Sequence, residues 1–147
     1  MSMYRSVVLA IDPLGEYASV IQKAKNIVAQ DGIIEMIYVW DETPVGLASD
    51  ASLIDLNDDD AIVHEQENKV KNLIEKIANK YDIAIANTHV LTGSAPKEIR
   101  NFAKQNDADC IVIGSHGRHG IALLLGSTAS SVVHGTPCDI LVVKISK

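Results

Sequence analysis

The chain has 147 residues, of which 47% are hydrophobic and only 4% are aromatic, so a folded core must be built from aliphatic side chains. At roughly 100–200 residues per domain, this length predicts one domain spanning residues 1–147. Thirteen Lys and Arg residues stand against nineteen Asp and Glu residues, which gives a formal net charge of -6. Because an acidic chain is not generally attracted to phosphate backbones, nucleic acid and anionic membrane surfaces are poor first candidates as partners.

The apolar segments and the cysteines predict the compartment. The N-terminal residues run directly into the apolar segment Val7–Ile11, which is too short for a signal-peptide core. No segment approaches the ~20 apolar residues of a membrane span. Cys110 and Cys138 lie far apart in apolar segments without a C-x-x-C pair, so we expect both to be buried, reduced core residues. These features predict a cytoplasmic protein.

Apolar periodicity alternates between two types in the first part of the chain. Val7–Ile11 is a continuous apolar segment rich in β-branched residues, which is typical of a strand buried on both faces. Residues 17–28 follow the period of a helix that ends before Gly32, and Ile33–Trp40 is predicted to be the second strand. Residues 41–60 show no sustained period, which predicts one long loop.

The second part of the chain continues this alternation. Strands are predicted over Ile83–Leu91, Cys110–Ile113 and Ile140–Val143. Helices are predicted over residues 70–81 with acidic residues 58–60 near the N-terminus, from Ser94 and Pro96 onward, and over residues 127–134. Strands that alternate with helices predict right-handed crossovers, and hence an α/β fold with an open sheet of five mostly parallel strands and helices on both faces.

In such sheets ligands bind beyond the carboxyl ends of the strands, near the point where the strand order reverses. The segments at or just beyond the carboxyl ends of the predicted strands are Asp12, Val39–Asp41, Gly93–Pro96 and Gly114–Ser131. Asp12 also fits the first position of an Asp-Pro turn. Turn formation and ligand contact are compatible, so both interpretations of Asp12 stay open.

The segment Gly114–Thr128 carries the strongest binding signal. It contains four of the nine glycines, which allow a backbone to adopt positive φ and to approach a ligand closely. The sequence Gly126-Ser127-Thr128 would place N–H groups and the positive end of a helix dipole at a phosphate, with two hydroxyls as further donors. The segment predicts an anion-binding loop, and the alternative is a glycine-rich turn that binds nothing.

Two common phosphate motifs are absent from the sequence. It contains no G-x-G-x-x-G, and the pattern G-x-x-x-x-G-K-[ST] fails because five residues separate Gly120 from Gly126 and no Lys precedes Ser127. A dinucleotide-dependent dehydrogenase and a P-loop NTPase are therefore not expected.

Several parts of the chain together match the pattern of one family. These are Gly114-x2-Gly117 with Gly126-Ser127, the first strand with its acidic end at Asp12, the strand end Tyr38-Val39, Gly93-x-x-Pro96, and Thr136–Val143. In these parts the chain resembles the universal stress proteins, whose nucleotide-binding members carry G-x2-G-x9-G-[ST] after the fourth strand. The resemblance covers nearly the whole chain. It implies a single-domain, Rossmann-like sheet in the order 3-2-1-4-5, similar to that of the adenine nucleotide alpha hydrolases.

The loop departs from the family pattern in one respect. Eight residues, Arg118–Leu125, separate Gly117 from Gly126, where the ATP-binding pattern has nine. The branch that resembles the founding member of the family is said not to bind ATP and has a similarly short loop, but it loses the second and third motif glycines, which this chain keeps. Deleting one residue shifts a loop by up to ~3.5 Å. The shift either misplaces a phosphate contact or is absorbed by a tighter turn at Gly120.

The resemblance implies a set of nucleotide contacts. Asp12 and the backbone around Ala10 and Val39 would contact adenine and ribose, and Ile113 and Gly114 would flank the nucleotide. The residues implied to hold the phosphates are Gly117, Gly126, Ser127 and Thr128. The implied ligand is ATP or AMP, with Mg²⁺ in the case of ATP.

We expect neither a metal site nor a catalytic centre. His116 and His119 lie three residues apart without further ligands at a suitable spacing, and the Asp residues between 50 and 60 lack the spacing of a calcium loop. The sequence has no G-x-S-x-G and no local signature of a cysteine nucleophile. Phosphoryl transfer usually recruits a Lys, a base and metal ligands. The expected protein is therefore not an enzyme, or at most a weak ATPase.

Three functions remain compatible with the sequence. The first is a small stress-response dimer that binds an adenine nucleotide and changes its interactions with partners. The second is an interaction module of the same fold that binds no nucleotide, and the third is a slow ATPase or phosphotransferase. In the implied strand order, Asp139–Ile145 is an edge strand, and pairing with its copy in a second subunit would satisfy both rows of backbone groups. A homodimer is therefore expected.

Overall fold

Five parallel strands form the centre of the molecule. The structure is a computed structural model that describes residues 4–40, 56–115 and 127–145, and only the backbone of residues 56–64, 127 and 128. The strands are β1 (Tyr4–Ala10), β2 (Val28–Trp40), β3 (Thr88–Thr92), β4 (Cys110–Gly114) and β5 (Asp139–Val143). All four neighbouring pairs are parallel, in the order β3-β2-β1-β4-β5. The predicted fold class and strand order are confirmed.

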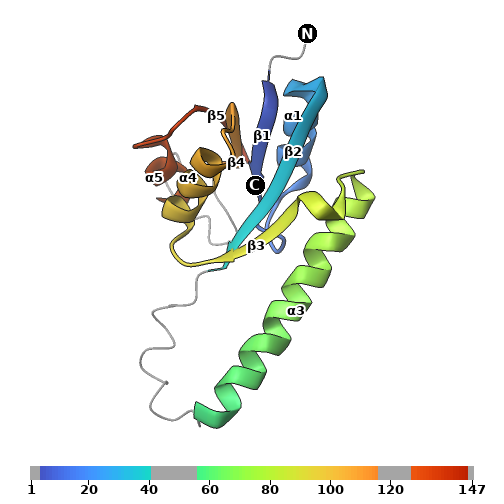
Figure 1. Cartoon of the computed structure of the whole chain (residues 1–147), viewed down its shortest axis with the longest axis vertical. Coiled ribbons are helices and arrows are strands. Elements are labelled where there is room, and N and C mark those ends of the chain that lie inside the picture. The colour runs from blue at the N-terminus through green and yellow to red at the C-terminus, as the bar shows by residue number, and fades with distance from the viewer. Residues whose placement is uncertain (1–3, 41–55, 116–126, 146–147) are drawn as a thin grey trace.

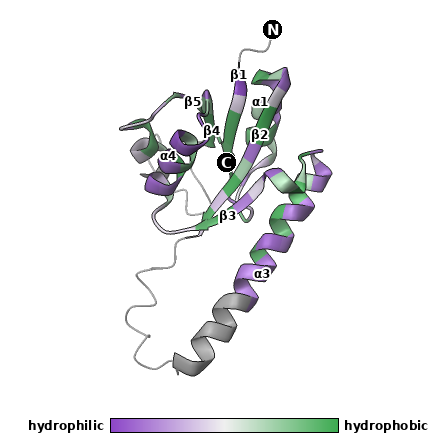
Figure 2. Ribbon diagram, in the orientation of Figure 1, coloured by the Kyte–Doolittle hydropathy of each residue, from purple (hydrophilic) through white to green (hydrophobic). Residues whose placement is uncertain are grey.

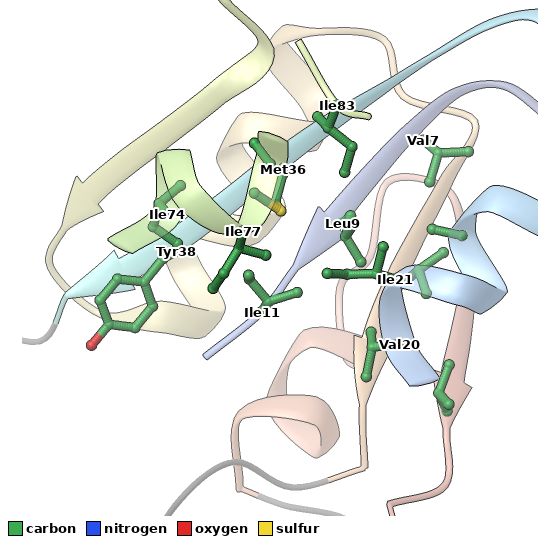
Figure 3. Packing of buried hydrophobic residues seen from close by; sticks show 14 of the residues in the cluster. Val7, Leu9, Ile11, Val20, Ile21, Met36, Tyr38, Ile74, Ile77 and Ile83 are labelled. Carbon is green, nitrogen blue, oxygen red and sulfur yellow. The ribbon is translucent and has the colours of Figure 1, made fainter. Parts of the chain in front are cut away.

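Helices cover both faces of this sheet (Figure 1). The helices are α1 (Ala18–Ile27), α3 (Leu56–Lys80), α4 (Ala95–Gln105) and α5 (Ser127–Val133), and η2 (Ile85–Asn87) is a short 3-10 turn. One core cluster joins the sheet to α1 and α3, and a second joins the opposite face to α4 and α5. The close-up in Figure 3 shows the first cluster, in which Leu9 lies between Ile21 and Ile77.

The central strand β1 shows why the sequence pattern predicts this fold. Val7, Val8 and Leu9 are all fully buried. Because successive side chains of a strand point to opposite faces, Val7 and Leu9 join the α1 and α3 cluster whereas Val8 and Ala10 join the α4 and α5 cluster. A strand covered on both faces needs an apolar residue at every position, which is the continuous pattern of Val7–Ile11.

Helix α3 is longer than predicted. It begins at Leu56, so residues 56–60 belong to the helix rather than to the loop, and residues 41–55 lie outside the described residues. The acidic residues 58–60 fall in its first turns, where they favour a helix start. Figure 1 shows that the first half of α3 extends past the sheet. The prediction depended on an apolar stripe that begins at Val70, so it left this half of the helix unassigned.

Figure 2 shows hydrophobic residues gathered on the strands, whereas α3 carries hydrophilic residues along much of its described length. The packed residues of α3, Ile74, Ile77 and Ala78, lie in its C-terminal part. Among the helices that the structure describes, none combines the length and hydrophobicity required to cross a membrane.

The predicted boundary between the first helix and the second strand is wrong. Helix α1 ends at Ile27, and Val28, predicted to be helical, is the first residue of β2. β2 advances from Val28 to Ile33 while β1 advances only from Tyr4 to Ser6, so the register shifts there. Gly32 lies in this irregular part of the strand and not at a helix end.

The third strand also begins later than predicted. Residues 85–87 form the turn η2, and β3 starts at Thr88. Ile83 is buried because it closes the end of α3, where its N–H donates to Ala78 O and the preceding Asp82 has a φ of 59°. An apolar residue that caps a helix resembles the first residue of a strand, which explains the error.

The close packing at Gly32 generates a stability prediction. A Cβ at this position would lie 2.8 Å from Val28 Cγ2 and 2.9 Å from the carbonyl oxygen of Arg5. We expect Gly32→Ala to lower the free energy of unfolding by about 1–3 kcal/mol, because the Arg5 backbone cannot yield without disturbing β1. Urea unfolding measures the change, with the exposed Gln30→Ala as control, for which about 0.5 kcal/mol or less is expected. Equal stabilities of the two variants would contradict the close contact.

Candidate functional site

The strand order reverses between β1 and β4, which is the point where sheets of this class bind ligands. Ala10 and Ile113 are register partners at the carboxyl ends of these strands. Asp12 follows Ala10 by two residues, and Gly114 follows Ile113 directly. The structure therefore brings four of the residues named from the sequence to one edge of the sheet.

Val39 belongs to the same edge on the next strand. Ile37 of β2 is the register partner of Ala10 and accepts a hydrogen bond from Ile11 N–H at 3.0 Å, and Val39 lies two residues further along. The side chains of Ala10, Val39 and Ile113 are 7%, 9% and 6% exposed and belong to the cluster on the α4 and α5 face. They are therefore part of the aliphatic core at the carboxyl ends of the three strands.

The carboxylate of Asp12 organises the turn after β1. Its Oδ1 accepts a hydrogen bond from Leu14 N–H at 3.0 Å, and its carbonyl oxygen accepts one from Gly15 N–H at 3.0 Å. This is the geometry of an Asx turn, so the turn interpretation of Asp12 is confirmed. The turn holds Leu14, whose side chain is 61% exposed.

Gly114 has a packing role that the sequence did not indicate. A Cβ on Gly114 would lie 3.2 Å from Ile145 Cγ1 and 3.4 Å from Val20 Cγ2. Both neighbours belong to the α1 and α3 cluster, on the face opposite to the Ile113 side chain. The close approach of Ile145 therefore favours glycine at this position independently of any ligand.

Ser115 was not singled out from the sequence. Its side chain is buried, its N–H donates to Val143 O at 2.8 Å, and its Oγ accepts a hydrogen bond from Ile145 N–H at 2.9 Å. β5 ends at Val143, because the N–H of Ile145 donates to the Ser115 side chain instead of to a neighbouring strand. The predicted strand Asp139–Ile145 is therefore too long by two residues. A serine 30 positions away from its partner leaves no local sequence signal.

The remaining predicted contacts lie at the start of α5 or outside the described residues. Ser127 is the first residue of α5, as predicted, and Thr128 is the second. Gly117, Gly126 and the histidines at 116 and 119 fall in residues 116–126, which lie outside the described residues.

A second polar pair lies away from this edge. His89 Nε2 on β3 lies 2.5 Å from Glu35 Oε2 on β2, and the imidazole ring packs 4.9 Å from the Phe102 ring of α4. This pair ties the edge strand to its neighbour beneath α4. Within the ranges that the structure describes, no group of three or more His, Cys, Asp or Glu residues is arranged to hold a metal ion.

The two cysteines differ in burial. Cys110 is buried, as predicted, whereas Cys138 is only half-buried, which corrects the prediction for the second residue. Neither forms a disulfide. Burial raises the pKa of the Cys110 thiol from 9.0 to about 11, helped by the charges of Cys138 and Asp139, and burial also raises the pKa of Cys138. Both thiols are therefore poor nucleophiles at neutral pH.

The raised pKa of Cys110 generates a reactivity prediction. Because a pKa of about 11 instead of 9.0 lowers the thiolate fraction at pH 8 by about 100-fold, native Cys110 should modify slowly with a disulfide reagent, and its rate should rise with pH until about pH 11. Cys138→Ser isolates Cys110 for this measurement, and the urea-unfolded variant serves as the reference. A native rate equal to the unfolded rate would contradict the burial of this thiol.

The fold is that of a Rossmann-like α/β protein, with aliphatic residues at the carboxyl ends of β1 and β4, where the strand order reverses. Comparisons with known proteins agree with this class. The model of the universal stress protein family matches residues 3–144. Universal stress protein A homolog 2 of Coxiella burnetii is 34% identical over 140 residues, which cover 95% of this chain and 92% of that protein. The chain therefore belongs to the universal stress protein family, a family of the stress response.

Solved structures share the fold at low sequence identity. The structure of the hypothetical protein MJ0577 is similar with a TM-score of 0.69 and 21% identity, covering 99% of each chain. A universal stress protein solved in complex with cAMP is similar with a TM-score of 0.65 and 16% identity, covering 99% of this chain and 100% of that one. At these identities the similarity shows the fold alone.

Proposed function

We propose that this chain binds an adenine nucleotide, ATP or AMP, at the carboxyl ends of β1 and β4 and acts in the stress response through interactions that depend on the bound nucleotide. The observation that carries the proposal is the pairing of Ala10 with Ile113 at the switch point, with Asp12 and Gly114 directly beyond them. A ligand at this edge meets backbone groups of two neighbouring strands at once.

The described residues fit the base and ribose of such a nucleotide. The side chains of Ala10, Val39 and Ile113 make this edge apolar, and small-molecule sites typically combine apolar surroundings with few polar groups. Asp12 follows Ala10 by two residues at the same edge. The phosphates are assigned to the sequence pattern of Gly117, Gly126, Ser127 and Thr128, and Mg²⁺ would be carried by the phosphates of ATP. The cAMP complex of a protein with the same fold supports an adenine nucleotide as the ligand class.

A specific observation favours a second candidate, an interaction module that binds no nucleotide. The close approach of Ile145 favours glycine at position 114, so the first glycine of the motif has an explanation that needs no ligand. The spacing of eight residues between Gly117 and Gly126 also departs from the ATP-binding pattern. A slow ATPase or phosphotransferase is the third candidate, and we propose at most slow hydrolysis, which release of inorganic phosphate measures.

The first prediction from this proposal concerns binding itself. Trp40, the only tryptophan, follows Val39 at the end of β2, so its fluorescence should change when a ligand occupies this edge.

ATP with Mg²⁺ at 100 times its dissociation constant should stabilise the fold by about 2.7 kcal/mol. If millimolar ATP gives neither a thermal shift nor calorimetric heat, the interaction module replaces the nucleotide-binding protein.

The second prediction assigns the phosphates to the loop. Gly126→Val should abolish the thermal shift produced by ATP, because a β-branched side chain obstructs the approach of a phosphate to the backbone. The matched control is Gln30→Val, which places the same side chain at an exposed position near the amino end of β2 and should leave the shift unchanged. Unchanged ATP affinity in Gly126→Val would mean that this part of the loop does not bind the phosphates.

We further propose a homodimer that pairs β5 with its copy. β5 is an edge of the sheet, and Ile140, Leu141 and Val142 are only half-buried in the single chain. An apolar edge strand that stays unpaired invites aggregation. Antiparallel pairing across a two-fold axis would use the free backbone groups of both copies and cover these side chains.

Proline at the centre of this edge tests the assembly. Val142→Pro removes a backbone donor and does not fit a paired strand, so we expect monomeric or insoluble protein. Light scattering should give about twice the chain mass of 15.9 kDa for the unmodified protein at micromolar concentration. A monomeric unmodified protein, or a proline variant that stays a stable dimer, would show that β5 is not the interface.

A further inference from the structure

Two hydrogen bonds connect Ser115, at the end of β4, with the end of β5 and the residues after it. Ser115 directly follows β4 and donates its N–H to Val143 O at 2.8 Å. Its Oγ accepts the N–H of Ile145 at 2.9 Å. Both bonds come from a serine that is 5% exposed, and it is the one buried polar residue among those the structure describes.

Ile145 also packs closely against Gly114 at the end of β4. Ile145 is buried, and its side chain approaches Gly114 so closely that a Cβ on the glycine would lie 3.2 Å from Cγ1 and 3.3 Å from Cδ1. Protein interiors are close-packed and transmit small displacements instead of absorbing them. A movement of Gly114 or Ser115 therefore displaces Ile145 or breaks its hydrogen bond.

The serine hydroxyl is specifically suited to this contact. An aliphatic side chain at position 115 would leave the buried N–H of Ile145 without this acceptor, and an unsatisfied buried donor is costly. A threonine keeps the hydroxyl and an alanine does not. The two substitutions therefore separate the hydrogen bond from the general need for a small residue.

From this geometry we propose that Ser115 is a positioning residue that couples ligand binding at the carboxyl ends of β1 and β4 to the chain segment after β5. The inference rests on the proposed nucleotide binding. A nucleotide that contacts Gly114 restrains Ser115 and thereby the Ile145 amide. Since coupling between two sites is reciprocal, any partner that engages the end of β5 changes the nucleotide affinity through the same contact.

Amide hydrogen exchange tests this coupling in the full chain. The readout is deuterium uptake of the peptide spanning residues 139–147, with and without saturating ATP and Mg²⁺. In the unmodified protein, ATP should slow exchange at Ile145 by about fivefold or more. In Ser115→Ala, ATP should still give binding heat but should no longer slow this exchange. Ser115→Thr should restore the response.

The outcomes of this experiment distinguish failure of the coupling from failure of nucleotide binding. Binding heat without slower exchange in the unmodified protein overturns the coupling alone, as does an equal response in Ser115→Ala. Absence of binding heat in the unmodified protein overturns the proposed nucleotide binding and this inference with it. If Ser115→Ala does not fold, Ile145→Pro removes the same hydrogen bond from the donor side, with Ile145→Ala as its control, because alanine keeps the N–H. Because proline has no amide hydrogen to exchange, the two variants are compared at the other amides of the peptide spanning residues 139–147. An ATP response in Ile145→Pro that equals that of Ile145→Ala overturns the coupling.

Discussion

The pairing of β1 with β4 is the contact on which the rest of the structure depends. Its register is fixed at the amino end by Asp109, whose Oδ2 accepts the N–H groups of Arg5 and Ser6 and whose own N–H donates to Ser6 O. A shift of one residue would turn every side chain of β1 to the wrong face. Because the register is fixed at this end, Ala10 and Ile113 are register partners at the carboxyl ends of the two strands. Hydrogen bonds at one end of the strands thus set the alignment at the other end.

The residues at the carboxyl edge have structural roles of their own. Asp12 holds the turn after β1, and Gly114 admits Ile145, whether or not a nucleotide is bound. A glycine or an aspartate at these positions is therefore compatible with both the nucleotide-binding and the non-binding members implied by the family resemblance. The sequence feature that bears on this choice is the spacing of eight residues between Gly117 and Gly126, where the ATP-binding pattern implied by the resemblance has nine.

The parts of the fold that the sequence predicts well are those whose burial is local and regular. Val7–Ile11 and Cys110–Ile113 are apolar at every position because helices cover both faces of the sheet, and such segments fall within a few residues of the observed strands. The predicted strand and helix boundaries are wrong where an apolar residue belongs to a different element from the one that its period indicates. Val28 begins an irregular strand directly after α1, and Ile83 closes α3. The first half of α3 escaped prediction because the apolar stripe used for the prediction begins only at Val70.

Polar contacts behave differently, since their partners are distant in the sequence. Ser115 and Ile145 are 30 positions apart, and Glu35 and His89 are 54 apart. Neither pair alters a local period, so neither can be found before the topology is known. Both pairs hold strands at the two edges of the sheet, β5 through Ser115 and β3 through His89. Apolar periodicity therefore identifies the segments that form the strands. The non-local polar pairs add contacts at the two edges of the sheet, beside the backbone pairing of β2 with β3 and of β4 with β5.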